Sequence, residues 1–302
     1  MTAPRPFCSE LARDTGEPLA ATASRVEHWL LVEYAGPWPY EALDAAAFAG
    51  PLREHLAATV ASLPRCRLLL IKPPGRSRAH SEVRVFRART TEDGGELRSL
   101  AVGRHDDLLD VDLAASPGRP VDHPLLLVCT HGIHDRCCAR YGQDLLRQVV
   151  QHTDRDRVWQ ASHVGGDRFA GNLVILPGGL YFGRVGDEET DLPRILTEHA
   201  AGRIDLSRYR GRSCYAFAVQ AAEGHVRRTT GLTEIGGLRL HAARREARDR
   251  FAVELLAVSA GVVHEVEVAL EHGEPALLTC KSRQPQRPRH YVVRAHRERR
   301  ES

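Results

Sequence analysis

The sequence lacks long hydrophobic runs. None approaches the ~18 to 20 apolar residues that a membrane-spanning helix needs, and the segment from Met1 to Cys8 has no apolar core typical of a secretory signal. Lysine is scarce too, since all but two of the 42 basic residues are arginine, and 39 acidic residues leave a net charge of only +3. Nucleic-acid binding requires a concentrated basic face. We therefore expect a cytoplasmic protein that binds neither a membrane nor nucleic acid.

Several catalytic motifs are also missing. The chain has no Gly-x-Ser-x-Gly nucleophile turn, no His-Glu-x-x-His metalloprotease motif and no Cys-x-x-Cys redox motif. The adjacent Cys137 and Cys138 are a poor substitute for a redox pair, because a disulfide between neighbouring residues is strained. Seven cysteines spread thinly over the chain do not make a secreted disulfide framework. We expect the chain to have no substrate turnover of its own.

Reactive side chains are concentrated in two short segments. The first runs from Cys129 to Cys138 and contains three thiols and two imidazoles. The second, Ser162 to Arg168, adds His163 and one carboxylate. Thiolate, imidazole and carboxylate are the ligands that transition metals and iron–sulfur clusters use. The sequence therefore predicts a metal or cluster site formed by these two segments.

Hydrophobic periodicity predicts two blocks with the same order of elements. The first block has strands at 29–34, 67–71, 83–87 and 97–102, with a helix at 51–62. The second block has strands at 124–128, 158–161, 172–176 and 180–185, with helices at 142–150 and 192–201. A different pattern follows, with a helix at 214–228 and strands at 238–243, 251–258, 262–270, 276–279 and 291–295. We expect the basic tail, Arg294 to Arg300, to be a frayed end.

A strand–helix–strand unit followed by a hairpin and a helix is the order of a thioredoxin-like fold. We therefore predict an α/β (α+β) protein with a thioredoxin-like block at 1–118 and a second thioredoxin-like domain, which carries the site, at 119–230. An antiparallel β extension with the basic tail occupies 231–302. The matching loop of the first block, around Gly36-Pro37-Trp38-Pro39, has neither cysteine nor histidine, so we expect this block to be a scaffold or a docking surface.

Several motifs in fixed order resemble those of the sucrase/ferredoxin-like family of thioredoxin-like ferredoxins. The motifs are Cys8-Ser-Glu-Leu, Trp29-Leu-Leu-Val-Glu33 with Gly36-Pro37-Trp38, Cys129-x8-Cys138, Ser162-His163-x-Gly-Gly-x-Arg168-Phe169 and Tyr181-x-Gly183-Arg184. The resemblance runs from the N-terminus to about residue 230. The family name does not imply sugar hydrolysis, and no carboxylate pair in the sequence supports that reaction.

The resemblance implies a [2Fe–2S] cluster bound by two cysteines of the C-x8-C loop and two histidines of a His-x3-His element. By that correspondence Cys129 and Cys138 hold one iron and His163 binds the other. Asp167 stands where the family has its second histidine, so it is the candidate fourth ligand. The implied role is electron transfer or redox sensing with an unidentified redox partner protein.

The residues themselves leave other interpretations open. Cys129 can be a packed core thiol, and Cys137 can be a spare ligand, a partner in cluster exchange or simply buried, which is the default. His131 and His134 can hydrogen-bond within the loop or orient a ligand. Asp167 can form an ion pair with Arg168 instead of binding metal. The remaining cysteines, which we expect to be buried structural thiols, are Cys8, Cys66, Cys214 and Cys280.

Two other functions use the same residues. A structural zinc site suits two cysteines, one histidine and one aspartate. A thiol oxidoreductase suits a thioredoxin-like fold, although it would need a thiol of lowered pKa at a helix start.

Overall fold

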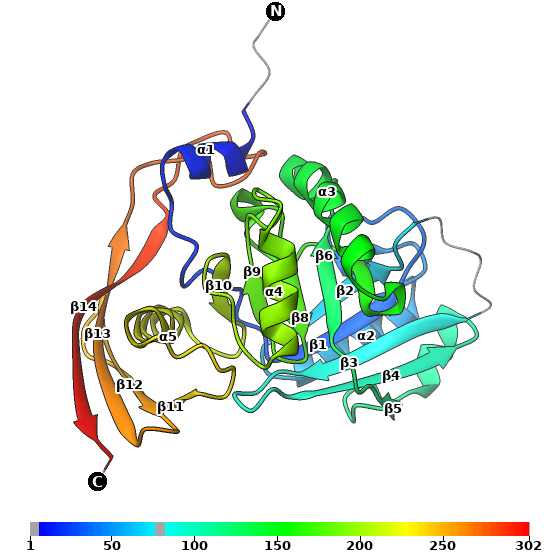
Figure 1. Ribbon diagram of the computed structural model, residues 1–302. Coiled ribbons are helices and arrows are strands. Elements are labelled where there is room, and N and C mark those ends of the chain that lie inside the picture. Colours follow the sequence, from blue (N-terminus) through cyan, green and yellow to red (C-terminus); the bar gives the residue numbers. More distant parts are fainter. Residues whose placement is uncertain (1–5, 76–81, 302) are drawn as a thin grey trace, which may run out of the picture. The chain divides into compact units, whose positions relative to one another are not determined.

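The repeated order of strands and helices is present in the computed structural model, which describes residues 6–75 and 82–301 (Figure 1). The first copy consists of β1 (His28–Glu33), α2 (Pro51–Ser62), β2 (Cys66–Lys72), β3 (Val83–Arg89) and β4 (Glu96–Val102). The second copy consists of β6 (Leu125–Cys129), α3 (Arg136–His152), β7 (Val158–Ala161), β8 (Leu173–Leu176), β9 (Leu180–Phe182) and α4 (Asp191–Ala200). In both copies the first strand pairs in parallel with the second strand and antiparallel with the third. The mixed α/β class is confirmed.

The chain divides into two units. The first, here called the cysteine unit, comprises Val26–Gly165 and Gly171–Gly179. The second, here called the C-terminal unit, comprises the described residues up to Arg25, Gly166–Ala170 and the chain from Leu180 onward. The domain boundaries near residues 118 and 230 stay a prediction.

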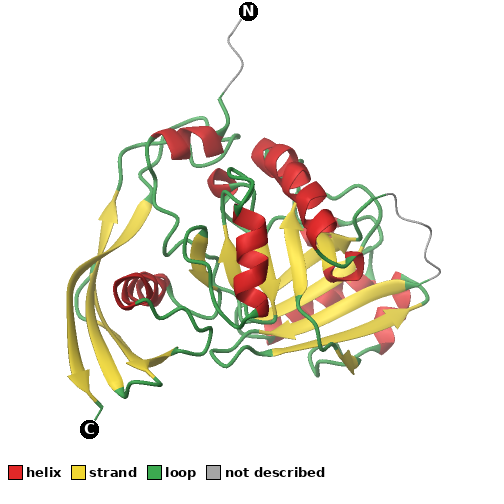
Figure 2. Cartoon of the chain, viewed as in Figure 1, coloured by secondary structure: helices red, strands yellow, loops and turns green. Residues whose placement is uncertain are grey.

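The cysteine unit is built on one mixed sheet, whose strands are drawn in yellow in Figure 2. Its strand order is β8-β6-β7-β2-β1-β3-β4-β5, where β5 is Arg119–Pro120. The two copies join where β2 pairs antiparallel with β7, with Ile71 opposite Ala161. The central strands are continuously apolar, as in Leu125 to Val128, because both of their faces are buried.

Helix α2 and its neighbouring turns cover the first copy. Pro51 begins α2, which suits proline because the first helical N–H needs no partner within the helix. Leu52 and Leu56 of α2 pack with Leu30, Leu70 and other buried residues in one core cluster. The described part of the chain also contains four short 3₁₀ helices: η1 (Ala42–Asp44), η2 (His105–Asp110), η3 (Arg155–Arg157) and η4 (Asp167–Phe169).

The C-terminal unit contains the predicted antiparallel β region. Its sheet has the order β11-β12-β13-β14, and α5 (Phe217–Thr230) packs against one face through a shared apolar core (Figure 1). The strands are β11 (Leu238–Arg245), β12 (Arg250–Ala257), β13 (Val262–His272) and β14 (Arg289–Arg300). The unit also holds α1 (Cys8–Asp14) and β10 (Tyr209–Arg212), which pairs antiparallel with β9.

Two predictions for this region are wrong. Residues 276–279 form no strand of their own; Ala276 makes an isolated bridge to Gln286. The tail from Arg294 to Arg300 is the end of β14, paired with β13 along its length. Successive side chains of a strand point to opposite faces of the sheet, and Arg299 points to the outer face. There it donates to Glu265 (2.7 Å) and to Glu254 (2.8 Å).

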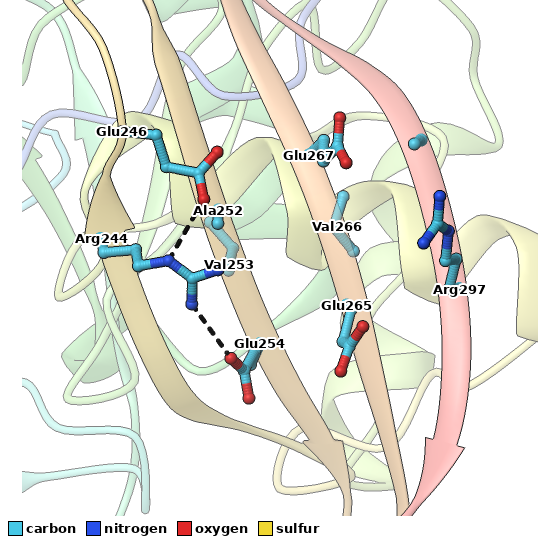
Figure 3. Close-up of a pocket in the computed structure, with 10 residues that line it drawn as sticks. Arg244, Glu246, Ala252, Val253, Glu254, Glu265, Val266, Glu267 and Arg297 are labelled. Carbon is cyan, nitrogen blue, oxygen red and sulfur yellow. Dashed lines mark hydrogen bonds and ion pairs between the residues drawn. The ribbon is translucent and has the colours of Figure 1, made fainter.

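The outer face of this sheet, away from α5, carries arginine and glutamate side chains that form ion pairs (Figure 3). Arg244 donates to Glu246 (3.2 Å) and to Glu254 (3.4 Å) across neighbouring strands. Exposed pairs of this kind contribute little to stability. None of the helices that the structure describes combines the length and the hydropathy required to cross a bilayer.

Candidate metal centre

Cys129 is the last residue of β6, the apolar central strand of the second copy. Its backbone N–H donates to the carbonyl of Asn172 (3.2 Å), and its side chain is 1% exposed. The following N–H, of Thr130, donates to the carbonyl of Ala161 at the end of β7 (3.2 Å). The sheet therefore fixes the direction in which the Cys129 thiol leaves the strand.

Cys138 lies in the first turn of α3. The helix begins at Arg136, six residues before the predicted start, because the carboxylate of Asp135 caps it by accepting from the N–H of Cys137 (2.8 Å). The positive end of the helix macrodipole favours an anionic sulfur at this position. The expectation that Cys137 is buried is confirmed, since it is 0% exposed.

A glycine lets α3 lie directly against the end of β6. A Cβ atom on Gly142 would stand 1.9 Å from the carbonyl oxygen of Cys129, which no side chain can occupy. Glycine at this helical position costs about 0.5–1 kcal/mol relative to alanine. The close approach that it permits sets the distance between the strand that carries Cys129 and the helix that carries Cys138.

His163 follows β7 directly, in the second segment predicted from the sequence. The hydroxyl of Ser162 accepts from the N–H of Leu70 (3.0 Å), which ties this turn to β2. The N–H of His163 donates to Nδ1 of His131 (3.2 Å), so His131 hydrogen-bonds within the site, as one of its two predicted roles requires. Since Nδ1 of His131 accepts, the neutral ring carries its hydrogen on Nε2.

The structure brings together three of the four predicted ligands. One ligand atom each from Cys129, Cys138 and His163 lies within 4.8 Å of the other two. Nδ1 of His163 is 4.0 Å from Sγ of Cys138. These residues come from the end of one strand, the first turn of a helix and the end of the adjacent strand, so the fold supplies the convergence.

The hydrogen bonds and charges around Cys129 favour the ionised form of its thiol. A hydrogen bond from the Cys138 thiol holds the pKa of Cys129 well below its ordinary value, with further lowering from His163 and the backbone of Val164. Burial acts in the opposite direction and is outweighed. Burial lowers the pKa of His131, which keeps this imidazole neutral at pH 7. The lowered pKa of Cys129 therefore favours the thiolate, which is the form that binds metal ions.

Two aromatic residues of the first copy's loop support the site, and sequence analysis missed their role. Trp38 packs edge-on against His131, with ring centroids 5.7 Å apart. Tyr40 stacks on His134 (4.5 Å), and His134 stacks in turn on His163 (3.6 Å, 13° between planes). The sequence shows Trp38 and Tyr40 in a predicted turn, but it does not show their partners, which lie about 90 residues farther along the chain.

A cavity of about 250 Å³ adjoins this stack. Its walls include Tyr40, Arg67, His131, His134, Ser162 and His163. The cavity gives the ring edge of His163 an approach from solvent, while both cysteines beside it stay buried.

Asp167 and Arg168 belong to the C-terminal unit. Asp167 is 5% exposed and begins η4, and its role as a ligand stays a prediction. Arg168 donates from Nε to Glu17 (2.7 Å). Gly166 has a left-handed φ of 86°, and a Cβ there would lie 2.3 Å from Nη2 of Arg210, so this glycine has a packing role within its own unit.

The cysteines outside the motif differ in exposure. Cys8 is buried, as predicted, whereas the other three are partly exposed: Cys66, Cys214 and Cys280. Sγ of Cys8 and Sγ of Cys280, both in the C-terminal unit, are 3.7 Å apart.

The donor set fits an iron–sulfur cluster and also fits zinc. Two thiols, one of them favoured as thiolate, and one imidazole satisfy the ligand preferences of either. The spacing favours a single ion: bonds of about 2.0–2.3 Å place the ligand atoms of one tetrahedral metal roughly 3.3–3.8 Å apart. A binuclear core needs a longer distance between His163 and the two sulfurs, so binding a [2Fe–2S] cluster would require the His163 side chain to move outward.

Fold and site together define an α/β protein with a candidate thiolate–imidazole metal centre. A family model for the sucrase/ferredoxin-like proteins matches residues 19–211, so the chain belongs to the sucrase/ferredoxin-like family. No curated protein and no solved structure matches the chain.

Proposed function

We propose that the chain is an electron-transfer or redox-sensing protein that binds a [2Fe–2S] cluster. In this proposal Cys129 and Cys138 bind one iron, and His163 and Asp167 bind the other. The two copies of the strand–helix–strand order are thioredoxin-like, and the second copy is the ferredoxin domain. The chain has no substrate turnover of its own and works with a redox partner protein.

One observation carries the proposal: the convergence of Cys129, Cys138 and His163 within 4.8 Å in a chain of this family. Two buried thiols and a partly exposed imidazole at one point have no need of one another for packing. A core thiol is common, but two thiols and an imidazole at one point, with a lowered pKa at Cys129, support a cation site.

Each residue has a defined task. A bound [2Fe–2S] cluster supplies the capacity to accept and release one electron. Cys129 and Cys138 contribute negative charge from buried positions, and His131 holds the backbone of His163 in place through its hydrogen bond. With Nδ1 of His163 turned toward Cys138, the opposite ring nitrogen is the position from which a proton leaves or returns.

The ring stack gives the site a path to the surface. Tyr40 is 49% exposed, and the rings of His134 and His163 follow it inward at stacking distance. Ile133 of the same loop is 61% exposed. An exposed aromatic and an exposed aliphatic side chain next to a redox centre suit a transient partner, since such residues are enriched at interfaces.

The proposed ligand set has a consequence for the potential. The oxidised core carries two positive charges, so two thiolates and one carboxylate leave a net charge of minus one. All-cysteine ligation gives minus two, and two-cysteine, two-histidine ligation gives zero. We expect a midpoint between about −400 mV, typical of plant-type ferredoxins, and about −150 mV, where the histidine-ligated range begins.

Metal analysis tests the proposal directly. Anaerobically purified protein should be red-brown and should contain iron and acid-labile sulfide in equal amounts. Asp167→His should raise the midpoint, because a neutral ligand replaces an anionic one, whereas Asp167→Ala should weaken cluster retention. A colourless protein without sulfide would contradict the cluster, and an unchanged midpoint in Asp167→His would remove Asp167 from the ligand set.

A zinc site is the second candidate, because the observed spacing suits a single tetrahedral ion. It would serve structure rather than electron transfer. Colourless protein that retains one zinc per chain, and loses it in Cys138→Ser, would establish this alternative.

A thiol oxidoreductase is disfavoured. Cys129 has the lowered pKa that such an enzyme requires, but Cys129 and Cys138 are 1% and 0% exposed. Thiol exchange needs a thiolate that the substrate disulfide can reach.

A further inference from the structure

A second group of metal-ligating side chains lies in the C-terminal unit. His264 on β13 stands opposite Glu298 on β14, and His296 stands one step along the same pair of strands, opposite Val266. Side chains directly opposite one another or two residues apart share a face of a sheet. This face packs against α5, because Val266 and Val226 of that helix belong to one core cluster.

The three polar groups converge on a single point. One ligand atom from each of His264, His296 and Glu298 lies within 4.8 Å of the others. Nδ1 of His264 is 2.9 Å from Nε2 of His296 and 3.5 Å from Oε1 of Glu298. These separations bracket the roughly 3.3 Å between two ligand atoms on one tetrahedral ion with bonds of about 2.0–2.1 Å.

The surroundings of the group suit a cation with access to solvent. His264 is 3% exposed, whereas the side chain of Glu298 is 58% exposed, so the group extends from the core to the surface. His225 of α5 covers it from the other side, with its ring 5.2 Å from that of His296.

The opposite face of the same sheet provides a contrast. There Arg299 and Arg244 occupy the carboxylates of Glu254, Glu265 and Glu246, and Figure 3 shows Arg244 between two of them. On the inner face the ion-pair neighbour of Glu298, in the described part of the chain, is His264.

We propose that His264, His296 and Glu298 form a second metal site, which binds Zn²⁺ or another borderline divalent first-row cation. Two imidazoles and one carboxylate are a ligand set that zinc uses, with a fourth position open to water on the exposed side. A bound ion would fasten the end of β14 to β13 beneath α5. The site is separate from Cys129, Cys138 and His163, and it does not depend on the proposed electron-transfer function.

Zinc uptake by the full-length protein tests the proposal, with Zn²⁺ alone as the probe. Wild-type protein and the variants His296→Gln, Glu298→Gln and His272→Ala are dialysed against Zn²⁺, and bound zinc and iron per chain are measured. We expect His296→Gln to bind one equivalent less than wild type and Glu298→Gln to bind at least about tenfold more weakly. His272, exposed on β13, is the matched control and should leave uptake unchanged. Equal uptake by wild type and His296→Gln would overturn the proposal.

A spectroscopic measurement keeps the test independent of folding defects and of the cysteine site. Cu²⁺ added to wild-type protein should give an electron paramagnetic resonance spectrum with nitrogen couplings from two imidazoles. The same spectrum in Glu298→Gln should keep both nitrogens, because this exposed residue supplies only oxygen. A spectrum with no imidazole nitrogens would contradict the site. Iron content should be the same in all variants, so a change in zinc or copper binding can be interpreted without reference to the cluster proposal.

Discussion

The two copies of the strand–helix–strand order have the same connections and different loops. In the first copy, the loop after β1 contains Gly36, Pro37, Trp38 and Tyr40 and has no cysteine or histidine before α2. In the second, the loop after β6 contains two histidines and leads to a cysteine pair in the first turn of α3. The sheet places both loops at the carboxyl ends of parallel strand pairs.

The difference shows a division of labour between equivalent loops. Trp38 and Tyr40 of the first loop pack on His131 and His134 of the second, so the loop without candidate ligands contacts the loop that has them. Lys72, at the end of β2, lies over the Trp38 ring at 4.5 Å from its centroid. These contacts are consistent with a scaffold role for the first copy, and the choice between a scaffold and a docking surface stays a prediction.

The largest expected effect comes from replacing the thiols at the two ends of the second loop. Cys129→Ser and Cys138→Ser should each abolish iron and sulfide binding, because a buried serine hydroxyl is neither thiolate nor soft ligand. Iron, zinc and sulfide per chain are measured together with the visible spectrum. The matched controls are Cys66→Ser, on β2 of the first copy, and Cys137→Ser, one residue from Cys138. Iron retained in Cys138→Ser would contradict the assignment of that residue as a ligand.

A second substitution gives α3 the residue that α2 has at the equivalent position. The seventh residue is Gly142 in α3 and Ala57 in α2. Gly142→Ala should lower the free energy of unfolding by about 1–3 kcal/mol, because the new Cβ meets the carbonyl oxygen of Cys129 and forces the helix from the strand. It should also reduce the metal content.

The reciprocal substitution controls for helix propensity. Ala57→Gly should destabilise by only about 0.5–1 kcal/mol and leave the metal content unchanged. Denaturant unfolding of the metal-free proteins provides both values. If Gly142→Ala is as stable as wild type, then close packing of α3 on β6 does not set the geometry of the site.

Much of this arrangement follows from local sequence pattern. The apolar runs that became β6 and β7 predict where Cys129 and His163 leave the sheet, and the spacing of nine positions between Cys129 and Cys138 predicts a loop that returns to the same point. The start of α3 was misplaced because periodicity of apolar residues begins only at Leu145. The cap was readable in the sequence, since Asp135 is a preferred residue before a first helical turn.

Contacts between distant segments could not be predicted. The stacking of Tyr40 on His134 depends on how two loops meet after the sheet has formed. The group of His264, His296 and Glu298 depends on the register of β13 with β14, which shifts at a bulge between Glu267 and Val268. Sequence spacing alone does not give that register, because a slip of one residue would turn these side chains to the opposite face.

A smaller effect concerns the pH dependence of the midpoint potential. If His163 binds iron, its outer N–H loses a proton more readily when the iron is oxidised than when it is reduced. Reduction then takes up a proton, so the midpoint should fall as pH rises, by up to about 59 mV per pH unit for a one-electron couple. Redox titration from about pH 6 to 10 checks this. A flat potential would contradict ligation by His163, and Cys66→Ser should reproduce the wild-type profile.

The smallest expected effect concerns the support from the first loop. Tyr40→Ala removes the exposed ring that covers His134, while Tyr40→Phe keeps the stack and removes only the hydroxyl. Because an aromatic pair contributes about 0.5–1.5 kcal/mol, the rate of cluster loss in air should rise roughly two- to tenfold in Tyr40→Ala. Bleaching of visible absorbance measures this rate, and Tyr40→Phe should match wild type. Identical bleaching in all three proteins would mean that the first loop lies beside the centre without stabilising it, and the division of labour between the two copies would then rest on Trp38 alone.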